Sequence, residues 1–349
     1  MDFFNQLSEK DYLTSNNFLN FSNTFYGAYV PKKELIKYDK ENYRVLLDEN
    51  GGCLIKNKSF KLKENDTIFC HTMLLEPLFN HLNNISNLKN IKLITHQSDL
   101  PIGKREFLKK PNCISKWYGI NINYDHEDLV AIPIGIGNFY NEKTLTSMHF
   151  EKINIFSSKT NKVYMNFNMN TNYFHRYNAY KYLFKKNFVV DKKPTLDLND
   201  YIKNINKYKF SLAPWGNGYD THRLWESLYA GAIPITLSHS SLLKFSDFPI
   251  VFLDKYKNFD IENEKFKKIK YFYNEKLNIN WWFNLINESN IKTDTREIEI
   301  KEDDELHAYN VKLFFNLYHK QNKIKQKNTI KRKLHKNLFG SRIYKNFGV

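Results

Sequence analysis

The stretch Ser211-Leu-Ala-Pro-Trp-Gly-Asn-Gly-Tyr-Asp-Thr-His-Arg-Leu-Trp-Glu-Ser-Leu-Tyr-Ala-Gly-Ala-Ile-Pro-Ile235 is the most informative part of this chain. An apolar run at residues 208–212 leads into it and predicts a strand. Gly216 and Gly218 flank Asn217, a spacing that lets backbone N–H groups approach a ligand closely. The start of the stretch therefore indicates a strand followed by a loop that can bind a ligand.

A helix is expected to follow this loop. Asp220 or Thr221 can cap it, because both side chains accept hydrogen bonds from free N–H groups. Its apolar side chains recur at helical spacing, at Leu224, Trp225, Leu228 and Tyr229. Gly231 can end the helix, and residues 233–235 begin a second strand. The whole stretch thus predicts a strand–loop–helix–strand unit.

The start of this helix carries side chains suited to a nucleotide. Free N–H groups and the helix dipole make a helix N-terminus a binding site for anions. Arg223 can fork onto phosphate oxygens, His222 lies beside it, and Glu226 shares its face one turn later. A cation and a carboxylate together suit a phosphate and a ribose diol. The alternative is an ordinary α/β unit in which Arg223 and Glu226 form a surface ion pair of little energy.

The same stretch resembles the donor-binding segment of GT-B glycosyltransferases, and is most similar to the exostosin-like family. The similarity rests on Thr-His-Arg-Leu-Trp-Glu at 221–226 and Gly-Ala-Ile-Pro-Ile at 231–235, within residues 208–237. A looser similarity covers residues 117–138 and 163–176. Ala213 stands before Pro214, where exostosin-like segments often have cysteine, which favours an offshoot of the family.

The resemblance implies the GT-B architecture, an α/β fold with two Rossmann-like domains facing a central cleft. It implies an acceptor site mainly on the first domain and a nucleotide-sugar site mainly on the second. Arg223 is then expected on the donor diphosphate and Glu226 on the ribose. Strands alternating with helices along the chain agree with parallel sheets.

The 349 residues are enough for two α/β domains of ordinary size. We expect an N-terminal domain at residues 1–150, a nucleotide-sugar-binding domain at 151–320 and a basic tail at 321–349. Short strands are predicted at residues 91–95 and 130–134, and a C-terminal helix at 306–320.

The net charge of +16 belongs largely to the end of the chain, because residues 320–349 hold 10 Lys and Arg and no Asp or Glu. Apolar residues at near-helical spacing accompany these charges. The tail can lie on an anionic membrane surface, bind nucleic acid or form a solvated helix. No apolar run is long enough to span a membrane and no signal-like segment begins the chain. We therefore expect a cytoplasmic protein, peripheral on a membrane, for which nucleic acid is an unlikely partner.

The chain contains no Asp-x-Asp motif, with which metal-dependent glycosyltransferases hold the donor diphosphate. We therefore expect no metal and no cofactor, and a mechanism in which arginine and N–H groups take the charge of the leaving group.

The scattered Cys53, Cys70 and Cys113 fit buried free thiols rather than metal ligands. Gly135 and Gly137 predict a hinge or a close-approach loop at the cleft. The expected donor-binding residues are Arg223, Glu226, Gly216, Asn217, Gly218, Asp220, Thr221, His222, Arg176 and Asn168.

An inverting enzyme needs a base that removes the proton of the acceptor hydroxyl. Asp99 and His96 follow the strand predicted at residues 91–95 and are the favoured candidates, ahead of His71 and Glu76. A retaining enzyme would need no such base, and the sequence leaves the stereochemistry open.

The sequence favours a metal-independent, inverting glycosyltransferase that moves a sugar from a nucleotide-sugar to a glycan or lipid-linked glycan, as in surface polysaccharide or glycoconjugate synthesis. The sugar, the nucleobase and the linkage have no sequence marker. The alternative is a basic binding module without enzymatic activity, which would hold nucleic acid or glycan.

Overall fold

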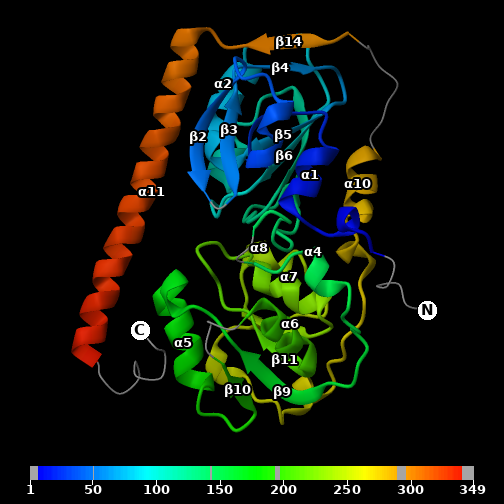
Figure 1. The fold of residues 1–349 in the computed structure, drawn as a ribbon, viewed down its shortest axis with the longest axis vertical. Coiled ribbons are helices and arrows are strands. Elements are labelled where there is room, and N and C mark those ends of the chain that lie inside the picture. The colour runs from blue at the N-terminus through cyan, green and yellow to red at the C-terminus, as the bar shows by residue number, and fades with distance from the viewer. Residues whose placement is uncertain (1–6, 50, 142–143, 193–196, 289–295, 340–349) are drawn as a thin grey trace.

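The computed structural model describes residues 7–49, 51–141, 144–192, 197–288 and 296–339. It shows a mixed α/β protein built around two sheets, one above the other in Figure 1. The larger sheet is mainly parallel, and this arrangement is compatible with a Rossmann-like α/β fold.

The first sheet has the order β2-β3-β1-β5-β6-β7-β8. Its strands are β1 (Thr24–Pro31), β2 (Tyr43–Glu49), β3 (Gly52–Asn57), β5 (Thr67–His71), β6 (Ile91–His96), β7 (Ile114–Gly119) and β8 (Leu129–Ala131). Strands β1, β5, β6, β7 and β8 are parallel, while β3 pairs antiparallel with β1 and β2. Helices α1 (Ser15–Phe21), α2 (Leu75–Leu82) and α3 (Lys104–Phe107) belong to this half.

The second sheet is entirely parallel and has the order β10-β9-β11-β12-β13. Its strands are β9 (Thr160–Met165), β10 (Val189–Asp191), β11 (Tyr208–Leu212), β12 (Ile233–Leu237) and β13 (Val251–Leu253). Its helices are α4 (Ser147–Phe150), α5 (Tyr173–Leu183), α6 (Leu198–Lys207), α7 (His222–Tyr229), α8 (Ser240–Leu243) and α9 (Glu264–Lys267).

The predicted strand–loop–helix–strand unit is confirmed as β11, α7 and β12. Thr221 occupies the N-cap position of α7, although its side chain makes no capping hydrogen bond. Gly231 ends the helix at a φ of +73°, where a Cβ would lie 2.2 Å from the Ile155 carbonyl oxygen. The strand expected at residues 130–134 is shorter than predicted, because β8 ends at Ala131 and Pro133 has no N–H to extend the ladder.

The two halves meet through the loops at the carboxyl ends of their strands. The Asp220 backbone N–H donates to Oδ1 of Asn121 at 2.9 Å, and Asp220 Oδ2 accepts from the Ile134 N–H at 2.8 Å. The Tyr229 hydroxyl accepts from the Leu13 N–H at 3.0 Å. One buried apolar cluster, with members such as Leu13 and Trp225, contains residues of both halves. The relative position of the two sheets is therefore set by buried contacts.

After β13 the chain returns to the first half. Helix α10 (Ile279–Asn287) lies beside α1 in Figure 1, and Phe283 stacks on Phe21 with 4.1 Å between ring centroids. Strand β14 (Ile298–Lys301) then pairs antiparallel with β4 (Ser59–Leu62). The sequence did not indicate this return.

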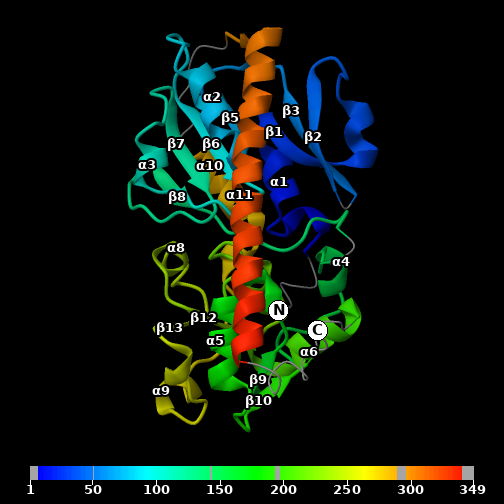
Figure 2. The same ribbon diagram turned by 90° about the vertical axis from the view of Figure 1, so that its left-hand side faces the viewer.

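The final helix α11 (Asp304–Phe339) is much longer than the helix predicted at residues 306–320. Figures 1 and 2 show it running alongside both halves of the molecule. Its first turns bury Val311 and Phe314 in the apolar core of the first sheet, and Tyr318 is the last of its side chains that packs on this core. The short 3-10 helices are η2 (Glu9–Asp11), η3 (Lys32–Lys37), η4 (Thr72–Leu74), η5 (Met169–Asn172), η6 (Tyr256–Asn258) and η7 (Glu275–Leu277).

Candidate functional site

The loop between β11 and α7 is folded tightly against its neighbours. The Gly216 N–H donates to the Gly218 carbonyl at 3.0 Å, and Nδ2 of Asn172 donates to the Gly216 carbonyl at 2.7 Å. A Cβ on Gly218 would lie 2.9 Å from Nδ2 of Asn121 in the first half. A side chain at 218 would therefore push against the Asn121 amide, which accepts from the Asp220 N–H, whereas Asn217 between the glycines is exposed.

Asp220 fixes the start of α7 in place. Its carboxylate is buried and accepts from the Ile134 N–H at 2.8 Å and from Nε1 of Trp225 at 2.7 Å. Burial raises the pKa of Asp220 to about 6, although these hydrogen bonds oppose the shift. Both of its oxygens are thus occupied, one by the first half and the other by α7 itself, which indicates a structural role beside the site.

Two arginine side chains approach each other on the second half. Arg176, on α5, is 8% exposed, and it donates from Nη1 to the Asn168 carbonyl at 2.6 Å and from Nε to the Trp215 carbonyl at 3.1 Å. Arg223, on α7, lies over the Tyr201 ring at 5.0 Å, and its buried Nη1 has no hydrogen-bond partner among the described residues. Burial and the charge of Arg223 lower the pKa of Arg176 to about 10.

In the part of the chain that the structure describes, neither guanidinium forms an ion pair with a carboxylate. Two neighbouring cations without an acidic partner repel each other, and an anion between them would relieve that repulsion. The site lies at the carboxyl ends of β9 and β11, where parallel α/β sheets bind their ligands.

Glu226 does not pair with Arg223. Its side chain is 5% exposed, and Oε2 accepts from the Tyr201 hydroxyl at 2.8 Å. Tyr201 thus contacts both residues, the arginine through its ring and the glutamate through its hydroxyl. The sequence carried no signal for Tyr201, because it lies on α6, outside the informative stretch. The surface ion pair considered as the alternative is absent from the described structure.

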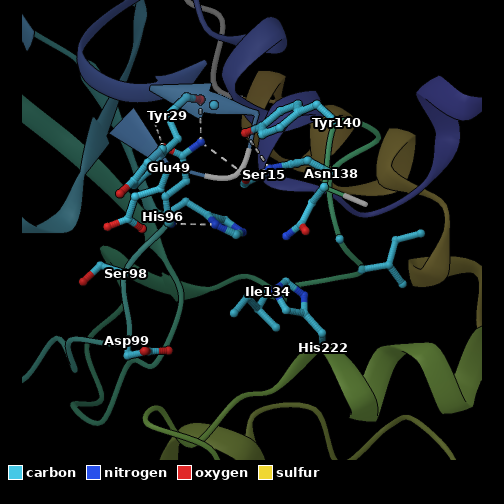
Figure 3. A pocket seen from close by; sticks show the side chains of 15 residues that line it. Ser15, Tyr29, Glu49, His96, Ser98, Asp99, Ile134, Asn138, Tyr140 and His222 are labelled. Carbon is cyan, nitrogen blue, oxygen red and sulfur yellow. Dashed lines mark hydrogen bonds between the residues drawn. The ribbon is translucent and has the colours of Figure 1, made fainter. Parts of the chain in front are cut away.

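A cavity of about 260 Å³ lies between the halves, and Figure 3 shows the side chains around it. It brings together His96 at the end of β6, Asp99 in the loop after it, and His222 at the start of α7. Residues of β1, β2 and β3, of the loop after β8 and of the helix α1 complete its wall. The lining residues are Ser15, Tyr29, Glu49, Gly52, His96, Gln97, Ser98, Asp99, Ile134, Ile136, Gly137, Asn138, Tyr140, Asn141 and His222.

His96 is 1% exposed and is held as a neutral ring. Its Nδ1 accepts from the Gln97 N–H at 2.8 Å, which places the ring proton on Nε2. Burial and the nearby His222 lower the pKa of His96 to about 3. Nε2 is enclosed near Pro133 and makes no hydrogen bond among the described residues. Asp99, by contrast, is exposed at the cavity wall.

His222 lines the cavity and directly precedes Arg223 on α7. Its Nδ1 donates to the Gly135 carbonyl at 2.7 Å. Gly135 has a φ of +69°, and a Cβ there would lie 2.0 Å from the Leu13 carbonyl oxygen. The close-approach loop predicted from Gly135 and Gly137 is therefore present, and both glycines pack tightly.

The described residues also bear on the sequence-based expectations for metal sites, thiols and membrane-spanning helices. They contain no group of three or more His, Cys, Asp or Glu side chains that could hold a metal ion. Cys53, Cys70 and Cys113 are buried free thiols, as the sequence predicted. Among the described residues, no helix is both long and apolar enough to cross a membrane.

Comparison with known proteins gives no family to which the chain can be assigned: no family model matches it, and no curated protein matches it significantly.

Proposed function

We propose that the protein is a glycosyltransferase of GT-B architecture, an offshoot of the exostosin-like family, that transfers a sugar from a nucleotide-sugar to a glycan acceptor. The observation that carries the proposal is the Arg176–Arg223 pair, which has no carboxylate partner in the described structure. A donor diphosphate would supply the missing negative charge at the carboxyl edge of the second sheet.

The remaining parts agree with this function. The cavity offers polar side chains to an acceptor, and His222, which lines it, directly precedes Arg223 in the chain. Departure of a nucleoside diphosphate requires stabilisation of its charge, which two fixed guanidinium groups can provide without a metal ion. The acceptor would enter between the halves, the donor would lie on the second half, and Glu226 beside Tyr201 would face the ribose.

The proposal predicts nucleotide binding that depends on Arg223. UDP, GDP, CMP and ADP are added to the protein without and with Mg²⁺, and the melting temperature is measured. One nucleoside diphosphate at a hundred times its dissociation constant should stabilise the protein by about 2.7 kcal/mol without metal. Arg223→Ala should weaken that binding at least tenfold, because a charge-assisted hydrogen bond contributes about 1.5–3 kcal/mol.

Arg44→Ala, at an exposed position of β2, is the matched control and should bind as the wild type does. A lack of any shift in the wild-type protein would count against the transferase, and a shift that strictly needs Mg²⁺ would contradict the metal-free mechanism.

We also propose that the distal part of α11 holds the enzyme on an anionic membrane. Residues 320–334 carry seven Lys and Arg and no acidic side chain. They follow Tyr318, the last residue of α11 that packs on the apolar core of the first sheet. Ile324, Ile330 and Leu334 are more than half exposed within this basic segment. Each lysine or arginine near an anionic surface contributes about 1 kcal/mol, and exposed apolar side chains can enter the interface.

Vesicles that contain phosphatidylserine should therefore co-sediment with the protein, and binding should weaken as salt rises. Replacing Lys323, Lys327 and Lys331 by Gln should reduce the bound fraction severalfold. The charge-matched control replaces the exposed Lys257, Lys268 and Lys270 by Gln. Equal loss in both variants, equal binding to neutral vesicles, or preference for nucleic acid at the same salt would argue against membrane docking.

A further inference from the structure

His222 is a titratable side chain of the second half that lines the cavity with residues of the first half. It begins α7, one residue before Arg223, and its ring lines the cavity together with residues that follow β6 and β8. In Figure 3 it lies near Ile134, across the cavity from Ser98 and Glu49. His222 therefore belongs both to the cavity wall and to the turn of α7 that carries Arg223.

The structure fixes the tautomer of this ring. A carbonyl oxygen can only accept, so the 2.7 Å contact with Gly135 places the ring proton on Nδ1. Nε2 of the neutral ring then carries a lone pair, and the structure gives that atom no hydrogen-bond partner among the described residues. A histidine with Nδ1–H held by a backbone carbonyl presents Nε2 as a proton acceptor or ligand.

The carbonyl that holds the ring is itself immobilised. The Ile136 N–H donates to the Leu13 carbonyl at 2.9 Å, and the Ile134 N–H donates to Asp220 at 2.8 Å, so bonds on both sides of Gly135 anchor the loop. The left-handed backbone of Gly135 fits against Leu13 without room for a side chain. The orientation of His222 is thus built into the contact between the two halves.

His96 and Asp99, the bases that the sequence favoured, are less suited to removing a proton. The Nδ1 lone pair of His96 is occupied by the Gln97 N–H, and its Nε2 already carries a proton and is enclosed. Asp99 is an exposed carboxylate at the cavity wall, and no hydrogen bond among the described residues holds its orientation.

We propose that Nε2 of His222 is the proton acceptor for the acceptor hydroxyl. This inference rests on the proposed transferase function and deepens it. Nε2 takes the proton as the hydroxyl oxygen forms its bond to the anomeric carbon of the donor sugar. The bond from that carbon to the diphosphate oxygen breaks, its electron pair leaves with the nucleoside diphosphate, and Arg176 and Arg223 meet the new charge. The imidazolium then releases its proton to water.

His222→Asn tests this assignment, because Nδ2 of asparagine can replace the Nδ1–H bond to Gly135 while no basic nitrogen remains. The assay measures release of UDP, GDP, CMP or ADP from UDP-glucose, UDP-N-acetylglucosamine, GDP-mannose, CMP-sialic acid and ADP-glucose with a panel of mono- and disaccharide acceptors. Turnover should fall by about 10²–10⁴-fold, while the dissociation constant of the nucleotide should change less than about twofold. His126→Asn, at an exposed histidine of the first half, is the control and should keep full turnover.

Turnover of His222→Asn within about tenfold of the wild type would overturn the assignment, and a much larger loss in Asp99→Asn would move the role to Asp99. A second measurement needs no substrate: the tautomer of His222 in the [¹⁵N]histidine-labelled protein, identified by the signals lost in His222→Asn. Protonation of Nδ1 is expected, and a proton on Nε2 would overturn the proposal. Nucleotide binding that survives Arg223→Ala would instead contradict the transferase itself, so the two failures are distinguishable.

Discussion

Replacing Glu302 by glutamine is expected to lower the free energy of unfolding by about 3–5 kcal/mol. The Glu302 and Lys56 side chains form an ion pair at 0% exposure. Oε1 of Glu302 also accepts from His81 at 2.7 Å and from Nδ2 of Asn310 at 3.0 Å, and the Tyr26 hydroxyl donates to it as well. Glutamine would leave the Lys56 charge buried without a counter-ion and would present an N–H₂ group to donors.

The electrostatics of this cluster agree with a fully ionised carboxylate. Burial alone would raise the pKa of Glu302, but the hydrogen bonds from His81 and Lys56 hold it well below its usual range. Burial lowers the pKa of Lys56 to about 8, opposed by the charge of Glu302. Because Glu302 follows β14 and precedes α11, the cluster attaches the returning chain to the first sheet.

Urea denaturation followed by tryptophan fluorescence measures the loss of unfolding free energy in Glu302→Gln. Glu305→Gln, one turn of chain further on and exposed, should change the unfolding free energy by no more than about 0.5 kcal/mol. The double variant Lys56→Met with Glu302→Gln should recover part of the loss, because no charge then stays buried without a counter-ion while the amide oxygen still accepts hydrogen bonds. A loss below about 1 kcal/mol in Glu302→Gln would show that the cluster is not a determinant of stability.

Asp220→Ala is expected to cost about 2–5 kcal/mol. The change leaves the Ile134 N–H and Nε1 of Trp225 without an acceptor in a buried place, and each such donor costs about 1–3 kcal/mol. It should also weaken nucleotide binding, because Asp220 holds the start of α7 against the first half. The control is Asp125→Ala, which removes an exposed ion pair with Lys244 between the same two halves and should cost under about 1 kcal/mol.

Asp220 also makes the free energy of unfolding depend on pH. Its pKa is about 6 in the folded protein, above the ordinary value of 3.8, so the folded state binds this proton more tightly than the unfolded state. The contribution of the protonated group is complete below about pH 4 and is lost as pH rises through about 6. Asp220→Asn, which cannot titrate, should flatten the unfolding free energy over this window relative to the wild type. An unchanged pH profile would contradict the assignment.

The local features of the site could be predicted from sequence. The strand, loop and helix at residues 208–229 follow from an apolar run, two glycines and helical spacing, all of which act between neighbours in the chain. Arg176 and Arg223 were predicted separately, and the structure brings them together. Asp220 was predicted to bind the donor, and the structure surrounds its carboxylate with bonds to Ile134 and Trp225.

Long-range partners had no local signal. No strand was predicted near residue 300, yet residues 298–301 form β14 and pair with β4. Residues 321–339 were expected as a tail and continue the helix α11. Lysine and glutamine favour helix, so the length of α11 agrees with propensity in retrospect.

The sequence alone determined the α/β character, the unit from β11 to β12 and the position of Arg223 at a helix start, because periodicity, glycine conformation and capping act over a few residues. Only the tertiary structure decided which side chains face the cavity, which nitrogen of His222 makes no hydrogen bond among the described residues, and which buried cation pairs with Glu302. The bond from His222 to Gly135 spans 87 positions and that from Tyr26 to Glu302 spans 276. Such partners are selected by burial, since a polar group removed from water must find its hydrogen bond wherever the folded chain supplies one.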